Sequence, residues 1–147
     1  MKRNIAILGL LALAVCAWAV SHLAVGRGVF RIGDDSRGVF RFIVAKHNDR
    51  VDGALEFKQI RRGEDRPVAV VMLRPVRVAE FLEHSAQFGG IGKFNGHEVL
   101  VGVRVIDGPP DGHDAFAIEC KNRDGQVVYS AAGELAEGNI EISHRRD

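Results

Sequence analysis

Three aspartates in one short loop are candidate metal ligands. Asp107, Asp111 and Asp114 lie in a segment rich in Gly and Pro. Calcium takes oxygen ligands from flexible loops, so these carboxylates form a candidate calcium site. Their spacing matches no standard calcium loop, however, and Asp also shapes turns by accepting hydrogen bonds from nearby backbone amides. A purely structural role for the three side chains is therefore the alternative hypothesis.

The histidines give a weaker signal for metal binding. His47, His84, His97, His113 and His144 are dispersed along the chain, and no two have the spacing that places both on one face of a strand or helix. Zinc needs several converging ligands, so the sequence predicts no zinc site. His97 and His113 are expected to cap turns instead.

Familiar catalytic signatures are absent from the sequence. There is neither a Gly-x-Ser-x-Gly elbow nor an H-E-x-x-H pair, and no Cys lies near a His in a known pattern. The glycines of residues 89–92 lead into no expected helix, which argues against a phosphate cradle. Glu56 and Glu80 would act as paired acids only if folding brought them together. We therefore expect no catalytic residues and no cofactor.

The cysteines also indicate little chemistry. Cys16 lies in a segment expected to be removed, and Val15 before it breaks the pattern of a lipid-attachment box. Cys120 is then the remaining cysteine, so no internal disulfide is expected. It shares a predicted strand face with Phe116 and Ile118, which favours a buried, small hydrophobic side chain.

The amino-terminal segment predicts export. Lys2 and Arg3 precede an uncharged apolar run over residues 5–15, and Ala17-Trp18-Ala19 has the small-x-small pattern of a signal peptidase site. These are the three parts of a secretory signal peptide over residues 1–19, which predicts a secreted or periplasmic protein. The alternative is an uncleaved anchor over residues 5–25 in the inner membrane, because that stretch is about the 20 residues a membrane helix needs.

The charge balance argues against a nucleic-acid partner. Removal of Lys2 and Arg3 from 20 basic residues leaves 18, against 19 acidic residues. A chain that is close to neutral lacks the basic surface that attracts a phosphate backbone.

Alternating hydrophobicity and turn residues predict a single all-β domain over residues 26–147. Asn95-Gly96 predicts a type I′ hairpin turn. Beyond it, Val99, Val101, Val103 and Val105 should face the core, whereas Glu98 and Arg104 should face solvent. Roughly nine or ten antiparallel strands at short, regular spacing indicate a barrel-like domain more than a flat sandwich.

Other segments carry more specific expectations. Residues 68–73 are almost entirely apolar and predict a strand that is buried on both faces. Residues 80–85 form either a single helical turn or a hairpin connection. The aromatic residues are expected on inward faces, where they either fill the core or line the mouth of a barrel that holds an apolar ligand; they are Phe40, Phe42, Phe57, Phe94 and Phe116.

The carboxyl-terminal third of the chain resembles a known family. Its Asp-Gly-Pro-Pro over residues 107–110 is followed by Asp-x-Phe-x-Ile at 114–118 and Gly-x-Leu-x-x-Gly-Asn-Ile-x-Ile at 133–142. This order is similar to that in a family of uncharacterised secreted bacterial β-domains, to which residues 53–57 and Asn95-Gly96 also correspond. The resemblance implies an exported β-domain and attaches no activity to it.

Together these features predict an exported, non-enzymatic accessory or binding domain that contacts an unknown envelope or extracellular partner. The alternative is a small carrier of apolar ligands with a lipocalin-like barrel, which would require a hollow interior. A hydrolase whose acids meet only after folding is the third hypothesis.

Overall fold

The computed structural model describes residues 21–145, which form nine strands. The strands are β1 (His22–Ile32), β2 (Ser36–His47), β3 (Arg50–Arg61), β4 (Ala69–Leu73), β5 (Val78–Phe81), β6 (Ser85–Phe94), β7 (His97–Ile106), β8 (Ala115–Lys121) and β9 (Val127–His144).

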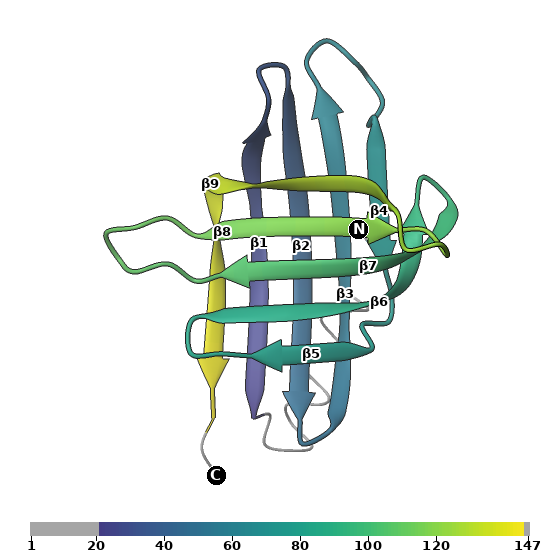
Figure 1. Ribbon diagram of the computed structural model, residues 1–147. Helices are drawn as coiled ribbons and strands as arrows, with labels where there is room; N and C mark the ends of the chain where they lie inside the picture. The colour runs from purple at the N-terminus through teal and green to yellow at the C-terminus, as the bar shows by residue number, and fades with distance from the viewer. Residues whose placement is uncertain (1–20, 146–147) are drawn as a thin grey trace.

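These strands form one antiparallel sheet that closes on itself (Figure 1). The strand order is β4-β3-β2-β1-β9-β8-β7-β6-β5, and a further pairing joins β4 to β6. Eight strands therefore make a closed barrel, while the short β5 extends the sheet beside β6. The predicted all-β, antiparallel, barrel-like fold is confirmed. Closure also removes the long unpaired edges that would invite pairing with other chains.

The long strand β9 connects two layers of the barrel. Its first half pairs with β8 and its second half with β1. In Figure 1, β1, β2 and β3 run across the direction of β5, β6, β7 and β8. Gly138 lies in the second half of β9 with a φ of 104°, and a Cβ there would overlap the carbonyl oxygen of Arg27. Only glycine accepts both this conformation and this close approach.

Stacked phenylalanine rings fill the barrel. The ring centroids of Phe40 and Phe116 are 4.1 Å apart, and those of Phe30 and Phe116 are 5.6 Å apart. The inward orientation predicted for Phe40, Phe42, Phe57 and Phe116 is confirmed, since all four are buried. Phe94 is half-buried at the margin of this core, where it stacks on Tyr129.

The hairpin of β6 and β7 has the predicted turn and register. Asn95 has a φ of 47° and Gly96 a φ of 85°, as a type I′ turn requires. The four valines at positions 99, 101, 103 and 105 are buried, whereas Glu98 and Arg104 are exposed. Local pattern was sufficient here because both the turn and the alternation are set by neighbouring residues.

Two expectations differ from the structure, and of the two alternatives for residues 80–85 the hairpin connection is confirmed. In β4 the odd-numbered residues are buried and Val70 and Met72 are half-buried, because the outer face of this strand is open to solvent. Residues 82–84 connect β5 to β6 as a hairpin, with no helical turn. The barrel begins at His22, four residues before the expected boundary, because residues 22–25 pair with both β2 and β9.

The signal peptide expected over residues 1–19 lies outside the described residues, as does most of the alternative anchor over residues 5–25. The last part of that anchor, residues 22–25, belongs to β1. Between residues 21 and 145, no helix is long and apolar enough to span a membrane.

Candidate functional site

The interior of the barrel is occupied by its own side chains. Phe30, Phe57 and Phe116 are almost completely buried, and the centroids of Phe57 and Phe116 are 5.9 Å apart. The phenylalanines that would line a lipocalin-like cavity therefore fill the space that a ligand would need.

The aspartates of the 107–114 loop support an edge of β9. Oδ2 of Asp114 accepts a hydrogen bond from the Ile140 amide at 2.7 Å, and Oδ2 of Asp107 accepts one from the Ile142 amide at 3.0 Å. β8 pairs only with the first half of β9, so these two amides have no partner strand on that side. The carboxylates satisfy donors that would otherwise be unpaired.

These contacts favour the structural role for the loop over calcium binding. The second carboxylate oxygen of Asp114 accepts a hydrogen bond from the Gly108 amide at 2.9 Å, while Asp111 is exposed. Between residues 21 and 145, no three His, Cys, Asp or Glu side chains are placed to hold a metal ion.

Burial favours the neutral forms of two ionisable side chains of the barrel, the buried Cys120 and the half-buried Tyr129. Burial, with a smaller contribution from Glu119, raises the pKa of the Cys120 thiol to about 11. Burial also raises the pKa of Tyr129 to about 12, and its hydroxyl donates a hydrogen bond to Oε1 of Gln59 at 2.7 Å. Neither group is ionised at neutral pH, so neither is poised as a nucleophile or a base.

The two glutamates considered as paired acids lie on different parts of the barrel. Glu56 is on β3, where its carboxylate accepts a hydrogen bond from Arg41 at 2.9 Å and lies 3.7 Å from Lys58. Glu80 is on β5, which pairs with β6. Folding therefore places Glu56 in an ion-pair cluster with basic residues of β2 and β3.

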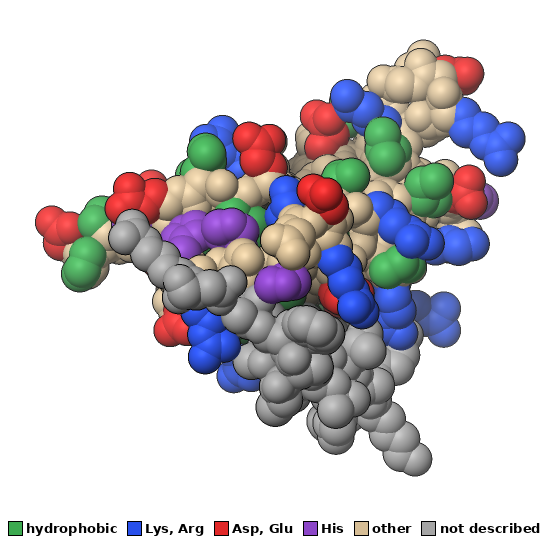
Figure 2. All heavy atoms as spheres, turned by 90° about the horizontal axis from the view of Figure 1, so that it is seen from below, with side chains coloured by type: hydrophobic (Ala, Val, Ile, Leu, Met, Phe, Trp, Pro, Cys, Tyr) green, Lys and Arg blue, Asp and Glu red, His purple; other side chains and the backbone are tan. Residues whose placement is uncertain are grey.

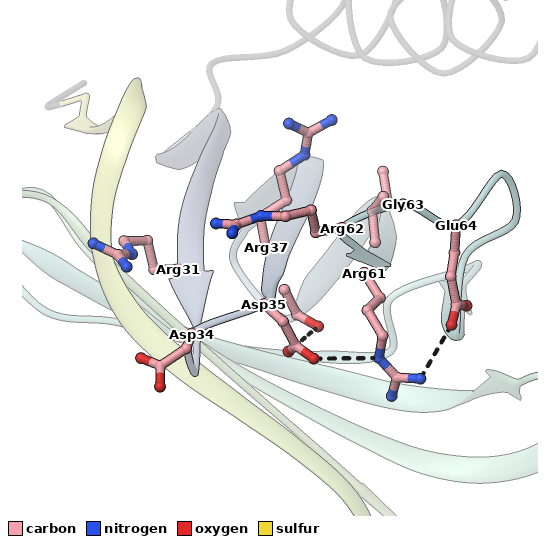
Figure 3. A pocket seen from close by; sticks show the side chains of 10 residues that line it. Arg31, Asp34, Asp35, Arg37, Arg61, Arg62, Gly63 and Glu64 are labelled. Carbon is pink, nitrogen blue, oxygen red and sulfur yellow. Dashed lines mark hydrogen bonds and ion pairs between the residues drawn. The ribbon is translucent and has the colours of Figure 1, made fainter.

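An arginine-lined hollow opens at one end of the barrel, between the β1–β2 turn and the end of β3 (Figure 3). Its volume is about 470 Å³. Among the arginines that line this hollow, Arg61 has its charge neutralised, because its guanidinium lies 3.7 Å from the carboxylate of Asp35 and 3.2 Å from that of Glu64. The backbone amide of Arg62 donates to the Asp35 carbonyl at 2.7 Å, which ties the end of β3 to the turn.

Three other arginines of this hollow lack such partners. Arg31, Arg37 and Arg62 are exposed and form no ion pair with any residue from 21 to 145. Figure 3 shows dashed contacts on Arg61 and none on these three side chains. Arg31 and Arg37 are also direct partners in the β1–β2 register, and like charges in this position repel. An anion between these guanidinium groups would relieve that repulsion.

A second hollow lies on the outer face of β5, β6, β7 and β8, with a volume of about 1300 Å³. Its floor includes Gly89, Gly102 and Ala117, and its margin includes the exposed side chains of Ile91 and Leu100. A Cβ at Gly102 would meet no other atom, so packing does not require glycine there.

The histidines are distributed differently from the expectation. His97 and His113 are exposed, and their side chains make no hydrogen bond with residues 21–145, so the turn-capping role is wrong. His84 lies between β5 and β6, 3.6 Å from Glu83, and His47 ends β2. Sequence reasoning missed the pairing of His144 with His22, because 122 residues separate them.

Comparisons with protein-family models, with curated proteins and with solved structures find no match to this chain. The resemblance to secreted bacterial β-domains accordingly stays a prediction from the sequence.

Proposed function

We propose that this protein is an exported, non-enzymatic binding domain that takes an anionic group of an envelope or extracellular partner in its arginine-lined hollow. The observation that carries the proposal is that Arg31, Arg37 and Arg62 have no ion-pair partner among residues 21–145, whereas Arg61 beside them is neutralised. Guanidinium groups bind phosphate and carboxylate oxygens through paired hydrogen bonds, and clusters of them are a common device for anion recognition.

The rest of the molecule supports a binding role. Buried and stacked phenylalanine rings occupy the interior, which favours binding at the surface over an apolar cargo inside the barrel. Cys120 and Tyr129 are neutral at physiological pH, which supports the non-enzymatic hypothesis. Export rests on the signal peptide predicted for residues 1–19.

Titration with inorganic pyrophosphate tests the binding site. We expect the Nε–Hε signals of Arg31, Arg37 and Arg62 to shift in NMR spectra at low salt, and the affinity to fall as salt is added. Arg37→Gln and Arg62→Gln should each weaken binding about tenfold, because each removes a charged hydrogen-bond donor. Arg123→Gln is the matched control, since its side chain is 93% exposed and lies in the β8–β9 connection.

Pyrophosphate that shifts no arginine signal, or that binds Arg37→Gln and wild type equally, would overturn the binding site. Export is tested separately by the intact mass of the protein recovered from the periplasm. A chain beginning at Val20 supports cleavage after Ala19, whereas a full-length chain in the membrane fraction supports the anchor.

A further inference from the structure

The outer face of β5, β6 and β7 exposes large apolar side chains to solvent. Val78 on β5, Ile91 on β6 and Leu100 on β7 are 64%, 61% and 55% exposed. They are three of the six exposed large hydrophobic side chains between residues 21 and 145. All three line the hollow of about 1300 Å³ on this face. Exposed apolar side chains that gather on one face are typical of an interaction surface.

Two residues of opposite charge stand on the same face without an ion-pair partner. Glu80 on β5 and Arg104 on β7 are both exposed, and neither forms an ion pair within the described part of the chain. They lie in one row across the sheet, because Gln87 of β6 is paired with both of them. Two strand spacings, or about 9.6 Å, therefore separate the acid from the base. A partner surface with the same two charges in reversed order would neutralise both.

The next row across these strands has a large side chain at one end and none at the other. Val78 is paired with Gly89, and Gly89 is paired with Gly102. A Cβ at Gly102 would meet no other atom of the chain, so the surface above this residue is open. Sheets that pack face to face lie about 10 Å apart, and side chains of both faces fill the space between them. This row thus presents a projection at β5 and a depression at β7.

A twofold axis along β6 makes the face complementary to itself. A half-turn about such an axis keeps every row at its level and exchanges the positions of β5 and β7, so the contacts are isologous. Glu80 of one copy then lies opposite Arg104 of the other, and Val78 lies opposite Gly102. Ile91 belongs to β6, so it meets the same residue of the second copy. The strands of the two sheets stay nearly aligned, as they do in β-sandwiches.

We propose that two copies of this chain associate through the outer face of β5, β6 and β7 about this axis. In Figure 1 these strands belong to the front layer of the barrel. Figure 2, which views the molecule from below, shows this layer along its upper margin, where acidic and basic side chains lie beside hydrophobic ones. A second copy is the partner that the face itself specifies, because the second copy brings the reversed charges and the projection that fits the depression.

The size of the face indicates a reversible dimer. Three strands span about 14 Å, and the ten residues of β6 span about 33 Å, so two copies together bury about 900 Å². Standard interfaces bury about 1,200 Å² or more, and smaller ones belong to weak, transient complexes. We therefore expect a dissociation constant on the order of 10–100 μM. Added salt should weaken the dimer, because it screens the two symmetric pairs of Glu80 with Arg104.

Sedimentation equilibrium of the exported protein, from about 1 μM to about 1 mM, tests the proposal by charge reversal. Glu80→Arg and Arg104→Glu should each weaken the dimer at least about tenfold, because the symmetry turns both ion pairs into contacts between like charges. The double variant restores the pairs in exchanged positions and should recover the wild-type affinity within about threefold. Glu137→Arg is the matched control for net charge, since this exposed residue lies in the second half of β9. Circular dichroism establishes that each variant is folded.

A cysteine on the proposed axis tests the geometry independently. Ile91→Cys should form a disulfide-linked dimer in air, because the axis brings this residue opposite its own copy. Arg123→Cys is the control and should stay monomeric, since its exposed side chain lies in the β8–β9 connection, away from the axis. Cys120 does not compete, because it is buried and its pKa is raised to about 11.

A chain that stays monomeric at about 1 mM would overturn the proposal. A dimer that neither charge reversal weakens, or that the double variant does not recover, would overturn it as well, because association would then use another surface. Equal cross-linking of Ile91→Cys and Arg123→Cys would contradict the twofold axis along β6. None of these measurements uses the arginine-lined hollow, so their outcome is independent of the proposed anion site.

Discussion

The two ends of strand β1 carry different chemistry on the same barrel. Arg31, near one end, faces other arginines that have no ion-pair partner between residues 21 and 145. His22, at the other end, is stacked on Phe81 and hydrogen-bonded to His144. A strand rises about 3.3 Å per residue, so the two ends are about 30 Å apart. One end offers exposed cations, and the other offers two imidazole rings held by hydrogen bonds and stacking.

The difference arises from the segments that cover each end. The 107–114 loop and the β5–β6 turn are hydrogen-bonded around the histidines, and they supply the carbonyl of Glu83 and the carboxylate of Asp107. At the arginine end, the turns are themselves rich in charged residues and stay exposed. An ordered site here depends on loops that fold back onto the barrel, whereas an open hollow results when they extend into solvent.

The largest expected effect concerns the core between the two ends. Phe116→Ala removes a ring that contacts Phe30, Phe40 and Phe57, so we expect the free energy of unfolding in urea to fall by about 3–5 kcal/mol. Val128→Ala, on the exposed surface, should change it by less than about 0.5 kcal/mol. Equal stability of the two variants would mean that the interior is hollow and that the ends are not separated by a solid core.

A smaller effect should distinguish the two ends directly. Asp107→Ala removes the acceptor for the Ile142 amide, so we expect a loss of about 1–3 kcal/mol and faster hydrogen exchange at that amide. Pyrophosphate binding at the arginine end should stay unchanged. Asp111→Ala is the control, because its side chain is exposed. A melting temperature that rises in calcium and falls in chelator would instead revive the calcium site.

The smallest effect is expected at a hairpin turn, the one formed by Asn95 and Gly96. Gly96→Val should cost about 1 kcal/mol or more in thermal unfolding, because a β-branched residue resists a φ of 85°. Gly102→Ala is the matched control, since an added Cβ there meets no atom. The affinity for pyrophosphate should be the same in both variants. A stable Gly96→Val protein would contradict the type I′ turn.

The sequence by itself determined the local features of this fold. The valines of β7 alternate with Glu98, Gly102 and Arg104, and Asn95-Gly96 accepts positive φ. The orientation of that hairpin could therefore be predicted without any knowledge of the strands beside it. The phenylalanines of β2, β3 and β8 were predicted to point inward for the same reason. Such features depend on residues one or two positions apart, so the sequence of each strand is sufficient to predict them.

Tertiary structure alone decided the candidate sites. The partnership of His22 with His144 depends on the pairing of the first and last strands, and no spacing in the sequence encodes it. Likewise, Arg62 joins Arg31 and Arg37 only because the end of β3 is bonded to the β1–β2 turn. Asp107 and Asp114 were singled out as possible calcium ligands, yet their carboxylates meet amides of β9 that are 26 to 35 residues away. The physical reason is that long-range contacts follow from barrel closure, which the periodicity of each strand does not determine.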